Sequence, residues 1–230
     1  MDEDDIIYIL NIDLGSVNFS FVIEEINLKY FKNIKNIPKN ERYNIDGSLT
    51  HDFEKILDEV YKNGKIVLFR NINLKSNIKD ISKDHEIFKN MIDCLDEYKE
   101  EYFDKVNYVV IEKQMKINQK ACRLSVCCIT YFIMNYDTPI FEFDSFHKTQ
   151  VLGCKKDEKK LKNGKIIYKA VDKPKRKKWS IENGSYILSL RDEIETFVDI
   201  FDIKKKDDIY DNINMCQAFK YLYFIDKIKL

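Results

Sequence analysis

Acidic residues end two apolar segments of the chain and open a third. Asp13 closes IIYILNID, Glu112 closes YVVIE, and Asp208 and Asp211 begin the amphipathic stretch DDIYDNINMCQAFKYLYF. A carboxylate at the end of a buried strand loses hydration, which costs free energy unless a cation or hydrogen bonds compensate. We therefore expect these four acids to share one cation site.

The types and the spacing of the acids indicate a metal and a reaction. Carboxylate oxygens favour hard cations, Mg²⁺ first and Mn²⁺ as its substitute. Asp208 and Asp211 are three positions apart, so on a helix they lie on one face, whereas Asp207 points elsewhere. Two ions in such a cluster activate water on one side of a phosphodiester and stabilise the leaving oxygen on the other. The pattern therefore favours phosphodiester hydrolysis.

Each acid also has a structural explanation when it is taken alone. Glu112 could cap the helix that follows it, and DDIYD could be an ordinary helix start, where acids suit the helix dipole. The order of the acids, on a first strand, a fourth strand and a late helix, is more specific than any one of them.

Hydrophobic periodicity predicts the elements that must position the acids. A continuous apolar run followed by the alternation in NFSFVIEE indicates two strands joined at Gly15 and Ser16. The remaining elements are predicted strands at 65–74, 106–112 and 139–144, and predicted helices at 51–63 after Thr50, at 82–103 from Ser82, and at 119–135. This succession predicts an α/β fold, a mixed five-stranded sheet with helices on both faces. Ligands of such sheets bind at strand carboxyl ends.

Composition limits the classes of protein. A chain of 230 residues, 44% hydrophobic and of zero net charge, fits a single domain whose attraction to nucleic acid must be local. No apolar run approaches the roughly 20 residues that span a bilayer, so no membrane partner is expected. The six cysteines form no CxxC pair and follow no secretory signal, which favours reduced thiols and an intracellular location. KPKRKK could be an import signal or a phosphate clamp, which leaves nucleus or cytoplasm open.

A lysine-rich segment separates the fifth strand from the late helix. Residues 155–178 hold twelve Lys or Arg and three Asp or Glu, and we predict a basic loop over 153–178, with helical character resuming after Pro174. Beside the acids, such a loop could hold DNA phosphates. The candidate DNA contacts are Lys175, Arg176, Lys177 and Lys178 here, and Lys113, Gln114 and Lys116 after Glu112.

Four segments in order resemble a known family over nearly the whole chain. NIDLGSVNFSFVI, YVVIEKQ, KPKRKKWSIE and KKKDDIYDNINMCQAFKYL resemble the motifs of poxvirus-type Holliday junction resolvases, relatives of RuvC-type enzymes within the RNase H-like fold. The resemblance implies that Asp13, Glu112, Asp208 and Asp211 are catalytic and bind two Mg²⁺ ions. It also implies a viral setting and a homodimer that makes symmetric paired incisions in four-way DNA junctions.

Two features remain open beside this resemblance. Residues 27–64 form a longer stretch than we expect of the family, and this insertion could contact DNA, lengthen a dimer surface or be a surface excursion. The helix predicted at 119–135 is apolar around most of its circumference, which suits either a core position or a two-fold contact. The implied homodimer favours the contact.

Other functions compete with junction cleavage. Asp13-Leu14-Gly15-Ser16 could be the first phosphate loop of an RNase H-like ATPase or sugar kinase, but the six glycines provide no second phosphate segment, so no small-molecule cofactor is expected. An RNA:DNA-hybrid nuclease or another branched-DNA nuclease would use the same acids. A non-catalytic DNA-binding scaffold of the same fold would not need all four.

Overall fold

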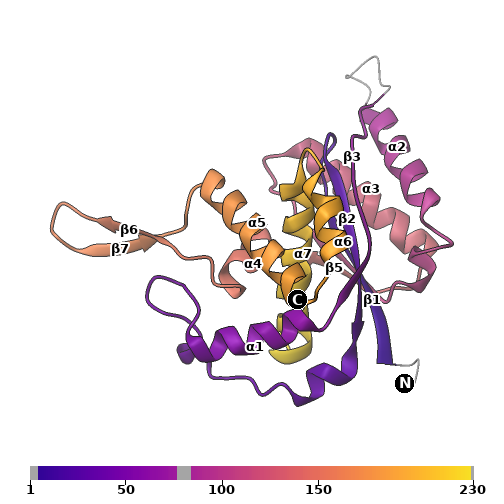
Figure 1. Cartoon of the computed structure of the whole chain (residues 1–230). Helices are drawn as coiled ribbons and strands as arrows, with labels where there is room; N and C mark the ends of the chain where they lie inside the picture. Colours follow the sequence, from indigo (N-terminus) through magenta and orange to yellow (C-terminus); the bar gives the residue numbers. More distant parts are fainter. Residues whose placement is uncertain (1–4, 77–83, 229–230) are drawn as a thin grey trace.

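A five-stranded sheet forms the centre of the molecule (Figure 1). The computed structural model describes residues 5–76 and 84–228. The strands, in the spatial order β3-β2-β1-β4-β5, are β3 (Lys65–Ile72), β2 (Phe19–Asn27), β1 (Ile6–Asp13), β4 (Tyr108–Glu112) and β5 (Ile140–Phe143). Of these five, β2 runs in the direction opposite to the other four, which are parallel to one another. This is the topology of the RNase H-like fold, so the predicted mixed sheet is confirmed.

Helices cover both faces of the sheet, as predicted (Figure 1). One face packs against α2 (Asp84–Glu97) and α3 (Gln119–Asn135). The other face carries α1 (His51–Lys62), α4 (Ser145–Val151), α5 (Lys173–Leu190), α6 (Ile194–Phe201) and α7 (Lys206–Lys220). Successive side chains of a strand point to opposite faces. Leu10 and Ile12 therefore pack in the hydrophobic core under α2 and α3, while Ile7 and Ile9 pack in the core on the face of α7. None of the described helices is long and apolar enough to cross a membrane.

Helix α7 lies deepest among the helices of its face and packs on β1 and β2. Its neighbour α5 comes close because Gly184 faces the ring of Tyr210, where a Cβ atom would overlap the ring. Near the middle of α7, Asn212 donates a hydrogen bond to the Ser20 hydroxyl of β2 at 2.8 Å. The helix that carries the late acids is thus fixed against the sheet from two sides.

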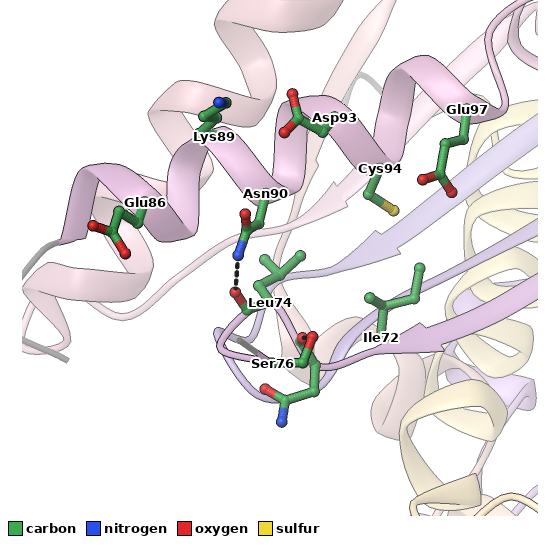
Figure 2. A pocket seen from close by; sticks show the side chains of 10 residues that line it. Ile72, Leu74, Ser76, Glu86, Lys89, Asn90, Asp93, Cys94 and Glu97 are labelled. Carbon is green, nitrogen blue, oxygen red and sulfur yellow. Dashed lines mark hydrogen bonds between the residues drawn. The ribbon is translucent and has the colours of Figure 1, made fainter. Parts of the chain in front are cut away.

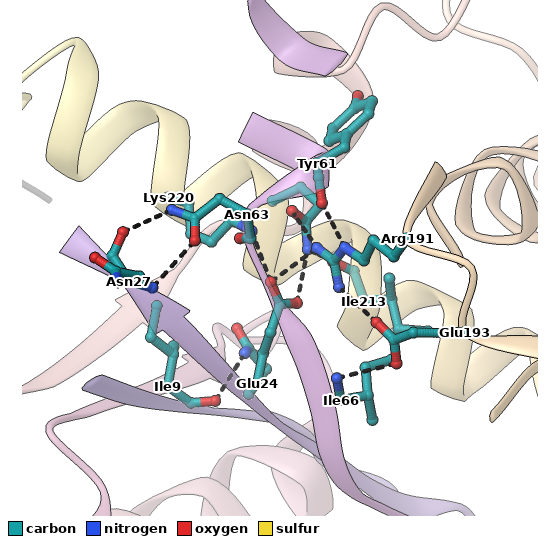
Figure 3. A network of polar contacts seen from close by, with 12 residues as sticks. Ile9, Glu24, Asn27, Tyr61, Asn63, Ile66, Arg191, Glu193, Ile213 and Lys220 are labelled. Atoms are coloured by element: carbon teal, nitrogen blue, oxygen red, sulfur yellow. Dashed lines mark hydrogen bonds and ion pairs between the residues drawn. The ribbon is translucent and has the colours of Figure 1, made fainter. Parts of the chain in front are cut away.

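A buried charge cluster fixes the other end of α7 (Figure 3). The fully buried Glu24 of β2 accepts hydrogen bonds from Lys220 at 2.6 Å, Arg191 at 2.8 Å and Gln217 at 2.8 Å. Burial alone would raise the pKa of Glu24, but Arg191 and Lys220 hold it below its usual value. Lys220 also donates to the backbone carbonyl of Asn63 at 2.7 Å. The cluster therefore joins α7, the sheet and the end of α1.

One predicted helix end and one predicted helix cap were wrong, and two helices were not predicted. Helix α2 ends at Glu97 instead of residue 103, because the chain turns at Tyr98 and brings Phe103 into the core. Its predicted start, Ser82, lies outside the described residues. Thr50 precedes α1 as expected, but its hydroxyl donates to the carbonyl of Glu41 instead of capping the helix. The seven-residue α4 and the eight-residue α6 were not predicted.

The segment 153–178, predicted as a basic loop, contains regular structure. Strands β6 (Asp157–Lys160) and β7 (Ile166–Lys169) pair antiparallel, and α5 begins at Lys173 with Asp172 as its N-cap. The two strands project from the body of the molecule (Figure 1). We refer to residues 155–169 as the basic ribbon.

The predicted insertion at 27–64 packs against the base of this ribbon. The Tyr43 hydroxyl donates to the carbonyl of Val151 at 3.1 Å, and the Lys156 amide donates to the carbonyl of Asp46 at 2.8 Å. The Asp46 carboxylate also pairs with Lys155 at 3.2 Å. Hydrogen bonds from Ser48, together with this lysine, lower the pKa of Asp46 to about 2. The loop at 43–49 therefore fixes the point where the ribbon leaves the body.

Two glycines of this region should respond differently to alanine. Gly153 has a φ of 75° and its missing Cβ would overlap the side chain of Leu49, whereas Gly164, at the ribbon tip with a φ of 82°, would meet no described heavy atom within 4 Å. We expect Gly153→Ala to lower the free energy of unfolding by about 2 kcal/mol or more, through both backbone strain and overlap. Gly164→Ala should cost at most about 1 kcal/mol, through strain alone. Urea unfolding of both variants checks this, and equal losses would contradict it.

Candidate active site

Sheet register brings Asp13 and Glu112 together. Ile12 of β1 lies opposite Ile111 of the parallel β4, so the next residue of each strand, Asp13 and Glu112, ends its strand at the same edge. The side chains of both acids point to the face of the sheet that carries α7. Ile9 and Val110 lie an even number of residues before Asp13 and Glu112, and both belong to the hydrophobic core on that face. Burial and the neighbouring Glu112 raise the pKa of Asp13 well above its usual range. The side chains of these two acids are therefore in close contact.

Lys148 of α4 lies among the acids. Its ammonium is 3.5 Å from the Glu112 carboxylate and 3.1 Å from the Asp211 carboxylate, and the residue is only 7% exposed. Burial by itself lowers the pKa of Lys148, but Glu112, Asp211 and then Asp13 more than offset this and raise it. One buried cation thus compensates three carboxylates that come from β1, β4 and α7.

Asp211 is held by a chain of polar side chains from α5 and α7. The Ser180 hydroxyl donates to the Asp211 carboxylate, and the Asn214 amide donates to the same hydroxyl oxygen at 2.9 Å. The Asn183 amide in turn donates to the Asn214 carbonyl oxygen at 2.7 Å. Ser180 and Asn214 are buried, so this chain fixes the direction of the Asp211 carboxylate.

Asp208 lies one turn before Asp211 on the same face of α7. Burial and the adjacent Asp207 raise the pKa of Asp208, and Asp211 contributes to the same shift. Asp211 also raises the pKa of Asp13, so its charge is coupled to both acids. Asp208 accepts a long hydrogen bond of 3.5 Å from Asn71 of β3, while Asp207 pairs with Lys177.

Several of the predicted DNA contacts are paired with carboxylates. Lys175 pairs with Asp157 of the basic ribbon at 2.8 Å, and Lys178 with Glu182 at 3.6 Å. After β4, Lys113 lies 3.7 Å from Asp144, and the Gln114 amide donates to the Glu112 carbonyl at 3.0 Å. Lys116 is exposed.

A cavity of about 210 Å³ opens beside the acids. Its lining includes Glu112 and Asp211 together with Lys148, Arg176 and Lys177. A second cavity, of about 400 Å³, shares Ser145, Thr149 and Arg176 with it and extends to the base of the basic ribbon. A groove therefore runs from the carboxylates over α4 toward the ribbon.

A larger cavity, of about 560 Å³, lies elsewhere, between the end of β3 and α2 (Figure 2). Glu86, Asp93 and Glu97 of α2 line it, and Asn90 donates to the carbonyl of Leu74 at 2.7 Å across it. None of the four predicted acids lines this cavity. Its volume alone does not make it the better candidate, because none of the three acids that line it is buried.

The donor set beside Lys148 suits a hard divalent cation. Within the described residues, no three acidic, histidine or cysteine side chains are already arranged as metal ligands. The acids nevertheless present only carboxylate oxygens, on partly buried positions that already require positive charge, and the Lys148 ammonium meets that requirement. The predicted metal site stays a prediction whose ligands would be Asp13, Glu112, Asp211 and Asp208.

Comparisons with known proteins relate the chain to a viral protein in sequence and to a solved structure in fold. No protein-family model matches the chain. The chain is 30% identical over 250 residues to "Uncharacterized protein 170L" of invertebrate iridescent virus 6, covering 99% of this chain and 93% of that protein. A solved structure of RuvC from Thermus thermophilus aligns with a TM-score of 0.48 and 10% identity, over 94% of this chain and 95% of that chain.

Proposed function

The chain belongs to the family of protein 170L of invertebrate iridescent virus 6, and we propose that it is a metal-dependent endonuclease that cleaves four-way DNA junctions. The observation that carries the proposal is the meeting of Asp13, Glu112 and Asp211 around one buried cation. Segments that are far apart in the sequence supply these acids. Their cluster lies at the carboxyl edge of the sheet, beside a groove lined by basic side chains.

Each acid has a role in this proposal. Asp13 and Glu112 hold Mg²⁺ at the strand ends, and Asp211 and Asp208 complete the ligand set from α7. When bound, the ions supply activation of water and stabilisation of the leaving oxygen. The Ser180 and Asn214 side chains keep Asp211 directed at the site. Lys148 offsets the repulsion among the acids and can turn to a phosphate oxygen when metal takes its place.

The DNA strand lies in the groove over α4 in this proposal. Arg176 and Lys177 line the cavity beside the acids, and Arg176 also lines the cavity that continues toward the ribbon. These two side chains bind the phosphates that flank the scissile bond, together with Lys173. The other predicted contacts do not line the two cavities and stay predictions: Lys113, Gln114, Lys116, Lys175 and Lys178.

Two copies of the chain act together in this proposal, because symmetric incision of a junction needs two active sites at a fixed separation. Helix α3 packs on the sheet through Leu124, Cys128 and Phe132. Its outer side leaves Val126 64% exposed and Ile133 66% exposed. This apolar outer side is the surface that we assign to the two-fold contact.

A direct test compares three substrates. Purified protein is incubated with a mobile four-way junction, a linear duplex and an RNA:DNA hybrid, each with Mg²⁺, Mn²⁺ or chelator. We expect paired, symmetric nicks in the junction with either metal and none with chelator. Preferred cleavage of the hybrid would replace the proposal by an RNA:DNA-hybrid nuclease, and binding without any cleavage would indicate a DNA-binding scaffold.

Two adjacent acids of α7 provide a matched pair for the ligand assignment. Asp208→Asn should reduce junction cleavage by at least about 100-fold, because it removes a ligand charge without changing volume. Asp207→Asn makes the same chemical change at the residue that pairs with Lys177, and cleavage should stay within a few-fold of the wild-type rate. Single-turnover cleavage with excess protein measures both. A large loss in Asp207→Asn with little loss in Asp208→Asn would make Asp207 the ligand. Full activity of both variants would show that Asp208 is not part of the active site.

A further inference from the structure

The basic ribbon projects from the body of the molecule, which it contacts at its base (Figure 1). We propose that it is a second DNA-binding element, which enters a groove of a duplex arm away from the scissile phosphate. This inference rests on the proposed function, which it deepens by adding a site on the arm of the substrate. The charge, the exposure and the fixed direction of the ribbon support it.

Charge is distributed unevenly along the ribbon. Residues 155–169 contain seven lysines and two acids. Asp157, one of the acids, pairs at the base with Lys175 of α5. From residue 159 to residue 165 there are four lysines and no acid, and all four are exposed: Lys159, Lys160, Lys162 and Lys165. The outer half of the ribbon is therefore a concentrated positive charge on a chain whose net charge is zero.

Strand register places this charge on both faces of the ribbon. Lys159 lies opposite Ile167, and Lys160 lies opposite Ile166. Successive residues of a strand point to opposite faces, so Lys159 and Lys160 place positive charge on different faces of the ribbon. Ile166 is 48% exposed although it is a β-branched apolar residue. A flat anionic surface would be matched by lysines on one face only. A groove of duplex DNA, which has phosphates along both walls and admits a two-stranded ribbon, matches both faces.

The base of the ribbon is rigidly held, so its direction is fixed relative to the acids. Asp46 binds Lys155 and the Lys156 amide, while Asp157 binds Lys175. The chain enters the ribbon from α4, which carries Lys148, and leaves it into α5, which carries Lys177 and Ser180. Both helices line the cavity beside the carboxylates. This geometry gives the insertion at 27–64 a role, since its loop at 43–49 holds the ribbon in place.

The length of the ribbon sets the distance at which it acts. Six residues from Asp157 to the turn extend roughly 20 Å at about 3.4 Å per residue. At about 3.4 Å per base pair, the ribbon spans about six base pairs of duplex. Contacts by its lysines should therefore appear on the arm beyond the nucleotides that the acids reach.

The test measures binding in chelator, where no cleavage occurs. A four-way junction with arms of about 20 base pairs is titrated with wild-type protein and with the variant K159Q/K160Q/K162Q/K165Q at several salt concentrations, and both complexes are footprinted with hydroxyl radicals. We expect the variant to bind at least about 10-fold more weakly at low salt. The slope of log affinity against log salt concentration should be shallower for the variant by about 3 to 4, since each lost phosphate contact reduces that slope by about 0.9. The protected region on each arm should shorten by about six base pairs.

A control variant of equal charge change separates the ribbon from net charge. K32Q/K55Q/K89Q/K105Q removes four exposed lysines elsewhere and should leave the footprint unchanged. The proposal would be overturned if both variants lost the same amount of junction affinity. It would also be overturned if the ribbon variant kept the wild-type footprint and the wild-type salt dependence of binding. Ribbon-dependent binding of RNA arms in preference to DNA arms would overturn the assignment to DNA. If wild-type protein binds the junction but does not cut it with Mg²⁺, the proposed function fails, while the footprint still decides the ribbon.

Discussion

Asp13→Asn is expected to abolish metal-dependent cleavage of the junction, with a loss of at least about 1,000-fold in the single-turnover rate. Asp13 is the central acid of the cluster, because it contacts Glu112 and its pKa responds to Asp211 and Lys148 as well. An amide is a poor ligand for two hard cations and leaves their charge uncompensated. Loss of about 4 kcal/mol of transition-state stabilisation corresponds to this factor.

The same substitution should not weaken the folded protein when metal is absent. Three carboxylates surround one ammonium at this site, so the cluster repels itself. Removing one of these charges while keeping the volume relieves that repulsion, and we expect the free energy of unfolding in chelator to stay equal or to rise by about 1 kcal/mol. Loss of activity with retained stability and retained junction binding would identify a functional acid.

Three measurements check this prediction together. Cleavage is followed with excess protein, junction affinity is measured in chelator, and unfolding is followed by urea with and without Mg²⁺. Wild-type protein should gain stability from Mg²⁺, since a ligand that binds only the folded state stabilises it. The substituted protein should gain none. Cleavage at a wild-type rate by Asp13→Asn would reject the active site proposed above.

Glu24→Gln is expected to be among the most destabilising single substitutions in the chain. Glu24 is fully buried and accepts hydrogen bonds from both Lys220 and Arg191 (Figure 3). Removing its charge leaves the buried Lys220 without a counter-ion among the described residues and Arg191 with only Glu193, at 3.4 Å. Breaking a buried pair in this way typically costs about 3–5 kcal/mol. Glu25→Gln is the matched control, because the neighbouring residue points to the opposite face and accepts from the Tyr8 hydroxyl in a partly buried position. It should cost less than about 1 kcal/mol.

The pH dependence of this effect has a definite sign. The folded pKa of Glu24 lies below its usual value, so its ionised form contributes stability above the unfolded pKa of about 4.3 and loses it as pH falls through the folded pKa. The difference in unfolding free energy between wild type and Glu24→Gln should therefore be full at pH 7 and shrink below about pH 4. A difference that is independent of pH would mean that shape, not charge, holds the cluster together.

The strands, and the meeting of Asp13 and Glu112 at one edge of the sheet, were predictable because strand burial and side-chain alternation are local patterns. The runs that end at Asp13 and Glu112 are largely apolar, and parallel strands bring their carboxyl ends to one edge. Nothing local marked Lys148, which stands in the short segment SFHKTQV between exposed positions. Its burial depends on α4 approaching α7, a contact between elements far apart in the sequence.

The basic ribbon shows the opposite case, a local signal that the lysine content concealed. Asn163-Gly164 is a common turn pair, and IIYK after it has strand character. The first strand, DEKK, has none, so the segment was predicted as a loop. Pairing with its partner across the turn, together with the support of the loop at 43–49, makes it a strand.

Helix α7 connects the two charged regions of the molecule. Asp208 and Asp211 lie in its first turns, and Gln217 and Lys220 bind Glu24 from its last. At 1.5 Å per residue, about 18 Å separates Asp208 from Lys220. A stiff rod of this length passes an axial shift from one end to the other. During divergence, substitutions around Glu24 should therefore persist only in combinations that keep the helix in register with the sheet, because any other combination would displace the acids at its far end.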